Sequence, residues 1–149
     1  MKFYLISPPF KQESFSTENF DFITDTLDIE YFQFRPKYKT LNKRIMFIKD
    51  YYESFNQICK KKKIKLIVNN DFEIAKKFKF NGIHLGEKDK TCREAKEEFG
   101  KNFIVGVSCY NSLSSYNSAL NQSADYVAFG SVYKSSTKKK EAINPENLI

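Results

Sequence analysis

The sequence predicts an α/β fold in which a parallel sheet is covered by helices. Short apolar runs alternate with segments of helical periodicity along the chain, which is the order of repeated βα units. Three of the runs, at 64–68, 82–86 and 126–130, end abruptly in polar residues. Because ligands bind at the carboxyl ends of parallel strands, these polar ends predict one site assembled from several loops.

The elements of the first half follow from apolar periodicity and from capping residues. In order, they are a strand at 3–6, a helix at 17–27, a strand at 30–35, a long helix with apolar positions from Ile45 to Cys59, and a strand at 64–68. We expect Ser16 or Thr17 to cap the first helix and Asn42 to cap the second, because their short polar side chains can accept the unpaired amides of a helix start. The apolar positions of the long helix advance by three or four residues, as a single buried stripe requires.

The second half continues the same alternation. In order, its elements are a helix at 72–78, a strand at 82–85, a helix at 91–99, a strand at 102–107, a helix at 112–121 and a strand at 125–129. Gly100 is expected to stop the helix at 91–99, because glycine suits the left-handed position after a helix end. No linker or composition break divides the chain, so residues 1–149 are predicted to form a single domain.

The composition is that of a folded protein that stays off membranes. Of the 149 residues, 41% are hydrophobic and 16% aromatic, enough to build a core. No run approaches the ~20 apolar residues of a membrane span, and the first apolar run is too short for a signal peptide, so we expect a cytoplasmic location. The three cysteines are widely spaced and only one histidine is present, which predicts reduced thiols and no zinc site.

The net charge of +7 raises the alternative of a nucleic-acid surface, because Lys and Arg release counterions when they bind phosphates. The distribution of the lysines favours a different interpretation. Lys60 to Lys63 stand before a strand, where they complement a helix dipole. Lys138 to Lys140 follow a hydroxyl-rich loop that suits a phosphorylated small molecule equally well. We therefore expect small-molecule partners, with neither nucleic acid nor membrane among them.

The second strand carries an unusual pattern. Gln33 and Arg35 fall two apart and share one face, which Lys37 joins if the strand extends past Pro36, while Phe32 and Phe34 occupy the other. Two interpretations remain open. In a barrel, the aromatics would pack under helices and the polar face would meet an anionic ligand near the mouth. In an edge strand, the polar face would simply be solvated.

Five segments stand in order at the predicted strand ends. They are 33–37 (QFRPK), 66–71 (LIVNND), 82–89 (GIHLGEKD), 106–108 (GVS) and 130–138 (GSVYKSSTK). In this order and spacing they resemble the successive motifs of thiamine phosphate synthase and of its sister family, thiazole tautomerase, over nearly the whole chain. The resemblance implies a TIM (β/α) barrel type of fold.

The resemblance also implies a transferase reaction. Hydroxymethylpyrimidine diphosphate is joined to hydroxyethylthiazole phosphate, which gives thiamine phosphate and pyrophosphate. In that family Mg²⁺ holds the diphosphate, whose departure leaves a pyrimidine methyl cation for the thiazole nitrogen to attack. Such chemistry depends on the placement of charge more than on a protein nucleophile.

By position, the resemblance implies roles for ten residues. Gln33, Arg35, Lys37, Asn69 and Ser108 would contact the diphosphate, Asn70 and Asp89 would hold Mg²⁺, Ser135 and Thr137 would contact the thiazole phosphate, and Lys138, with Ser108, would be catalytic. Pattern alone also allows simpler roles. Asp89 fits a capping or first-turn acid of the next helix, Ser108 fits a strand end, and His84 fits a satisfied core histidine.

Three departures from the family pattern set the alternatives. Position 70 is Asn where the family has a metal-binding Asp, a loss that Asp71 would have to compensate. Tyr110 stands where the tautomerase branch has its catalytic His, which argues against tautomerase activity. Six predicted strands, where a barrel has eight, indicate a barrel that lacks its last two βα units. The alternatives are a fragment, a homo-oligomer that covers the exposed sheet edges, and a reduced, non-catalytic or regulatory binder of a phosphorylated thiamine precursor.

Overall fold

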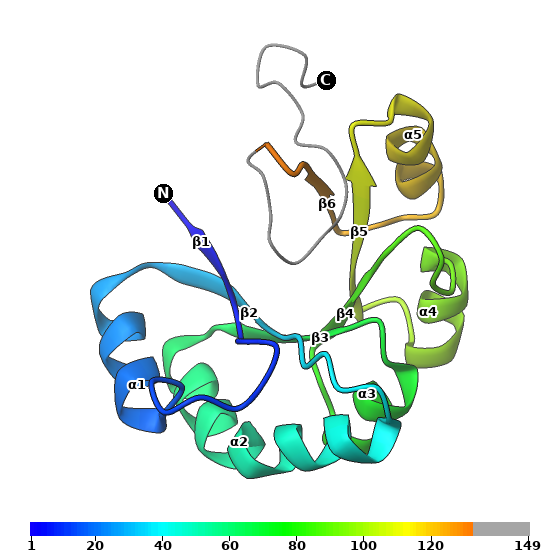
Figure 1. Ribbon diagram of the computed structural model, residues 1–149. Helices are drawn as coiled ribbons and strands as arrows, with labels where there is room; N and C mark the ends of the chain where they lie inside the picture. Colours follow the sequence, from blue (N-terminus) through cyan, green and yellow to red (C-terminus); the bar gives the residue numbers. More distant parts are fainter. Residues whose placement is uncertain (133–149) are drawn as a thin grey trace. The chain divides into compact units, whose positions relative to one another are not determined.

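The computed structural model describes residues 1–132 and contains the predicted alternation of strands and helices (Figure 1). The chain divides into two compact units, Met1–Ile83 and His84–Ile149, which are described separately. Within the described residues, no helix is both long enough and apolar enough to cross a membrane. A single domain over 1–149 stays a prediction.

The first unit alternates three strands with three helices before β4 begins. In order, these are β1 (Phe3–Ile6), α1 (Thr17–Thr26), β2 (Ile29–Phe34), α2 (Leu41–Lys62), β3 (Lys65–Asn69) and α3 (Phe72–Phe78). β2 lies between β1 and β3 and is parallel to both. In Figure 1, α1 and α2 lie on the same side of these strands. The strand at 30–35 and its neighbours are confirmed to within one residue at each end.

The core of the first unit is built from aromatic rings. Phe32 and Phe34 alternate along β2 and are fully buried, as is Phe55 of α2. Phe20 of α1 stacks on Phe55 with ring centroids 4.3 Å apart. Burying such a ring contributes roughly 1.5–3 kcal/mol, so this face of β2 anchors the helices and leaves the other face for polar groups.

The caps of the first two helices confirm one prediction and correct another. Ser16 caps α1, and its side chain accepts a hydrogen bond from the Asn19 amide. Thr40, and not Asn42, caps α2, because its backbone is extended and its hydroxyl accepts from the Lys43 amide. Asn42 already lies in the first helical turn. Both residue types suit a cap, so only the backbone conformation distinguishes them.

The second unit takes in the end of β4 (Gly82–Leu85), followed by α4 (Cys92–Phe99), β5 (Ile104–Tyr110), α5 (Leu113–Asn121) and β6 (Tyr126–Phe129). Its strands are neighbours in chain order, and β5 and β6 are parallel. β5 begins two residues later than predicted and runs three residues further, because a turn from Gly100 to Phe103 delays its start. Gly100 ends α4 as predicted, but its φ of +92° and ψ of 162° are not the left-handed helical conformation that was expected; they form another positive-φ conformation that favours glycine.

Candidate functional site

Gln33 lies at the carboxyl end of β2 and is paired with Asn69 of the neighbouring strand. Its side chain donates from Nε2 to Asn69 Oδ1 over 3.3 Å, and only 2% of the residue is exposed. β2 is a central strand and its glutamine is buried, so the edge-strand interpretation is wrong. Primary amides offer both donors and acceptors, so the pair is suited to polar recognition at this strand end.

Arg35 and Lys37 follow β2 in a loop that the end of β1 supports. The Arg35 amide donates to Ser7 Oγ over 2.8 Å, and Ser7 itself is 5% exposed. The Lys37 amide donates to the Pro9 carbonyl over 2.8 Å. Lys37 was expected to share the face of Gln33 only if the strand extended past Pro36. The strand ends at Phe34, so the position of Lys37 is set by this loop.

Burial and a neighbouring cation both act on Lys37 in this loop. Partial burial, followed by the charge of Arg35, lowers the pKa of the Lys37 ammonium. Both causes disfavour the charged form of the lysine. An anion bound beside Arg35 and Lys37 would oppose both, so the loop is electrostatically suited to a phosphate group.

Asn70 follows β3 in a left-handed conformation, with a φ of +45°. Its Oδ1 accepts a hydrogen bond of 2.9 Å from Asn69 Nδ2. Asparagine is among the few residues with a side chain that adopt this conformation readily. The backbone at position 70 therefore turns sharply at the strand end and presents an amide oxygen there.

Asp71 does not substitute for the acid that position 70 lacks. It caps α3, where Oδ1 accepts from the Ile74 amide over 3.3 Å. Its Oδ2 pairs with Arg44 Nε at 2.8 Å, and the Asp71 side chain is 10% exposed. Both carboxylate oxygens are engaged in local structure, so compensation by Asp71 is not supported.

In the second unit, Asp89 closes the loop that follows β4. Its Oδ2 accepts from the Gly86 amide over 2.7 Å, and its own amide donates to the Gly86 carbonyl. The cap of α4 is Thr91, in a reciprocal capping box with Glu94. The interpretation of Asp89 as a cap or first-turn acid is therefore wrong. Its carboxylate belongs to the strand-end loop.

Ser108 lies within β5 and is joined to His84 of β4. His84 Nε2 and Ser108 Oγ are 2.9 Å apart, and His84 Nδ1 lies 3.1 Å from Tyr126 Oη. The strand-end interpretation of Ser108 is wrong, whereas His84 is a satisfied histidine as that alternative predicted. A Cβ on Gly106 would collide with the Tyr126 ring, so glycine at 106 makes room for the tyrosine.

Mg²⁺ prefers oxygen ligands, and the strand ends offer several. Among residues 1–132 no group of three or more His, Cys, Asp or Glu side chains could hold a metal ion. Mg²⁺ usually takes one or two protein ligands and completes its shell with water and substrate phosphates. The amide oxygen of Asn70 and the carboxylate of Asp89 are hard donors of that kind, and each fits such a role in its own unit.

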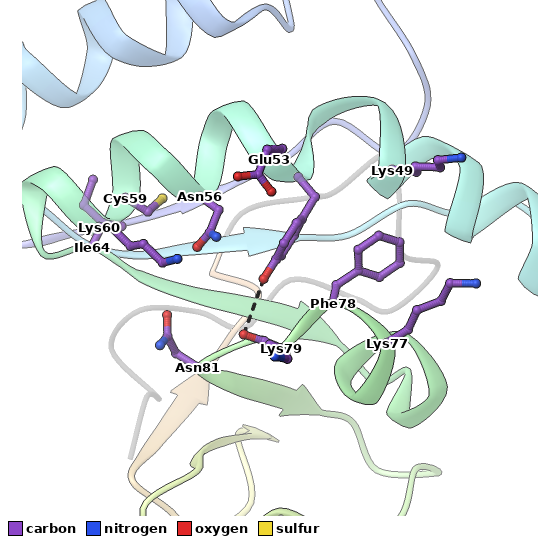
Figure 2. A pocket seen from close by; sticks show the side chains of 11 residues that line it. Lys49, Glu53, Asn56, Cys59, Lys60, Ile64, Lys77, Phe78, Lys79 and Asn81 are labelled. Atoms are coloured by element: carbon purple, nitrogen blue, oxygen red, sulfur yellow. Dashed lines mark hydrogen bonds between the residues drawn. The ribbon is translucent and has the colours of Figure 1, made fainter.

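A hollow of about 770 Å³ on the first unit lies apart from these residues (Figure 2). It is lined by side chains of α2, α3 and the segments that follow them, and Tyr52 Oη donates to the Lys79 carbonyl across 3.4 Å. Of the predicted site residues within 1–132, none lines it. This hollow and the polar strand ends are thus different features of this unit.

The family model described as "Thiamine monophosphate synthase" matches residues 3–148. The chain belongs to this family. It is 38% identical over 136 residues to the thiamine-phosphate synthase of Pelagibacter ubique, covering 91% of this chain and 63% of the relative. It is 34% identical over 121 residues to the thiamine-phosphate synthase of Nitrosomonas eutropha, covering 81% of this chain and 55% of the relative.

The structure resembles that of a thiamine phosphate pyrophosphorylase from Pyrococcus furiosus, with a TM-score of 0.70 at 22% identity over 89% of this chain and 60% of the other. This likeness confirms the TIM (β/α) barrel type of fold. The chain spans between 55% and 63% of the lengths of the three proteins compared. Membership of the family confirms the resemblance that the five motifs predicted.

Sequence reasoning did not predict several residues that matter for the local geometry. Three residues that it did predict lie outside the part of the chain that the structure describes. Ser7, Arg44 and Tyr126 support the site residues through contacts with distant parts of the chain, which no local pattern announces. Ser135, Thr137 and Lys138 lie outside the described residues, so their roles stay predictions.

Proposed function

We propose that this chain carries the thiamine-phosphate synthase reaction, in which hydroxymethylpyrimidine diphosphate and hydroxyethylthiazole phosphate give thiamine phosphate and pyrophosphate. The observation that carries the proposal is the polar end of β2, where buried Gln33 is hydrogen-bonded to half-buried Asn69 next to a loop with two cations. Family membership supports this enzyme over the non-catalytic binder.

In the first unit, the diphosphate is the group that the residues suit. Arg35 supplies a planar fork for two phosphate oxygens, and Lys37 adds a point charge. Gln33 and Asn69 supply amide donors to the same ligand. Stabilising the charge that grows on departing pyrophosphate is the contribution that a dissociative reaction needs most.

A bound Mg²⁺ would supply positive charge to the diphosphate, which would make pyrophosphate a better leaving group. The residues that would offer oxygen to a magnesium ion are Asn70 in the first unit, through its side-chain amide, and Asp89 in the second unit, through its carboxylate. The neutral ligand at position 70 weakens the attraction for the metal. Magnesium binding is therefore expected to depend strongly on the phosphate oxygens of the substrate.

The second unit supplies the remaining described role. Ser108 contacts the diphosphate, with its hydroxyl oriented by His84. Ser135, Thr137 and Lys138 are assigned to the thiazole phosphate and to catalysis by the family motif alone. Tyr110, in place of the tautomerase histidine, supports the synthase branch.

A cytoplasmic location agrees with three cysteines that form no disulfide. An oligomer that covers the sheet edges stays a prediction.

Thermal unfolding with inorganic pyrophosphate and Mg²⁺ tests the proposal on the whole chain. A ligand that binds only the folded state, at a free concentration of about 100 times its Kd, raises the free energy of unfolding by about 2.7 kcal/mol. The unfolding temperature then rises measurably. We expect this rise with both ligands present and a much smaller rise in the Arg35→Gln variant. An unfolding temperature that does not respond to the pair overturns the proposal.

A further inference from the structure

Arg44 of α2 contacts the two loops that follow neighbouring strands of the first unit. Its Nε donates to Asp71 Oδ2 over 2.8 Å, at the start of α3. Its Nη1 donates to the carbonyls of Tyr38 and Lys39 over 3.1 and 3.4 Å. The Arg44 side chain is 28% exposed and that of Asp71 is 10% exposed, so water screens the pair only in part. One guanidinium thus joins the loop after β2 to the loop after β3.

The position of Arg44 is unfavourable for a cation on helix electrostatics alone. It is the fourth residue of α2, whose first turn contains no acidic residue. The start of a helix favours negative charge because its amides carry a partial positive charge. The contacts to the two loops, and not the helix, therefore account for an arginine here. Its rigid fork directs donors to two partners at once, which the single ammonium of lysine does less well.

The two loops carry the residues proposed to bind diphosphate and magnesium. Tyr38, whose carbonyl accepts from Arg44, directly follows Lys37, and the Lys37 amide is tied on its other side to Pro9. Asp71, whose carboxylate pairs with Arg44, directly follows Asn70 with its φ of +45°. Arg44 therefore holds the residue next to Lys37, which is proposed to bind the diphosphate, and the residue next to Asn70, which is proposed to bind magnesium.

We infer that Arg44 is a positioning residue for pyrophosphate binding, which fixes the loop of Lys37 and the turn of Asn70 without itself contacting the ligand. This inference rests on the proposed function, because it assigns the two loops to that function's ligand. It predicts that loss of the fork loosens both loops and weakens pyrophosphate binding, while the rest of the first unit keeps its structure.

The experiment compares Arg44→Met and Arg44→Lys with a matched control, Lys43→Met. Lys43 is the preceding residue of α2 and has an exposed side chain, so the control makes the same replacement beside the fork. Hydrogen exchange of the whole chain is followed by mass spectrometry in peptides that cover 36–41 and 69–75. Pyrophosphate affinity in the presence of Mg²⁺ is measured by calorimetry.

We expect faster exchange in both peptides and about tenfold weaker pyrophosphate binding in Arg44→Met, as when a group that supports a ligand shell is removed. Arg44→Lys should lie nearer to Arg44→Met than to the parent chain, and Lys43→Met should match the parent chain. If Arg44→Met fails to fold, Arg44→Lys gives the same comparison.

Unchanged exchange in either loop overturns the inference, and so does an affinity that stays within twofold of the parent chain while both loops loosen. If the parent chain itself binds no pyrophosphate, the proposed function fails. In that case, the exchange data alone decide whether Arg44 holds the two loops.

Discussion

Asn70 offers a neutral amide at a position where a negatively charged carboxylate would attract Mg²⁺ more strongly. Its left-handed backbone is compatible with aspartate as well as asparagine, so Asn70→Asp changes the charge with little cost in conformation. We expect the variant to bind pyrophosphate with Mg²⁺ about tenfold more tightly, or about 1.4 kcal/mol, in a calorimetric titration.

The control for that titration is Asn70→Gly, which keeps the positive φ and removes the oxygen ligand. It should bind pyrophosphate more weakly than the parent chain when Mg²⁺ is present and about equally when it is absent. Equal affinities for the Asp, Asn and Gly chains would show that position 70 does not ligate the metal.

Cys59 illustrates a residue whose chemistry is suppressed by the core. It is 1% exposed, and burial raises the pKa of its thiol to about 12 from an ordinary value near 9. Because the folded pKa is the higher one, the stabilising contribution is complete below about pH 9 and is lost as the pH rises toward about 12.

The measurement is urea unfolding of the parent chain and of Cys59→Val between pH 8 and 11. The free energy of unfolding of the parent should fall more steeply above pH 9 than that of the variant. At pH 8, a thiol reagent should label Cys59 only as fast as the chain opens. Rapid labelling of Cys59 in the folded chain would contradict the burial described here.

At the scale of elements, β5 depends on a glycine. A Cβ on Gly106 would overlap the ring of Tyr126, which is hydrogen-bonded to His84. Gly106→Ala should therefore destabilise the chain by about 1–3 kcal/mol in urea unfolding, the range for overpacking. In a chain that already carries Tyr126→Ala, the same change should cost far less. An equal cost in both backgrounds would show that the ring is not the obstacle.

The strands and helices were largely predictable, because hydrophobic periodicity and helix capping depend on residues that are close in sequence. The helix over 72–78 and the strand over 82–85 were predicted with their observed bounds. The choice between Thr40 and Asn42 as cap was not predictable from residue type, since both suit the role and the extended backbone at Thr40 decides it.

The site was predictable where it follows from strand order and was missed where it depends on distant contacts. Gln33 and Asn69 meet because β2 and β3 are neighbours, as the βα order implied. Arg44 reaches Asp71 across 27 positions of sequence, and no spacing in the chain signals that pair. The roles of the site residues stay predictions from the family resemblance, whereas the contacts that hold their loops come from the three-dimensional packing.

At the scale of the whole molecule, family membership and the polar strand ends point to one chemistry. The chain matches the thiamine monophosphate synthase family over 3–148, and its first unit gathers amides and cations at the ends of adjacent strands. The net charge of +7 is compatible with the phosphorylated substrates that we propose for this chain.

The most direct test is the formation of thiamine phosphate by the whole chain from hydroxymethylpyrimidine diphosphate and hydroxyethylthiazole phosphate, followed by chromatography. We predict product that requires Mg²⁺ and appears with one pyrophosphate for each thiamine phosphate, at a rate at least tenfold lower in Arg35→Met. If the folded parent chain forms no thiamine phosphate with both substrates and Mg²⁺ present, the proposed function is contradicted.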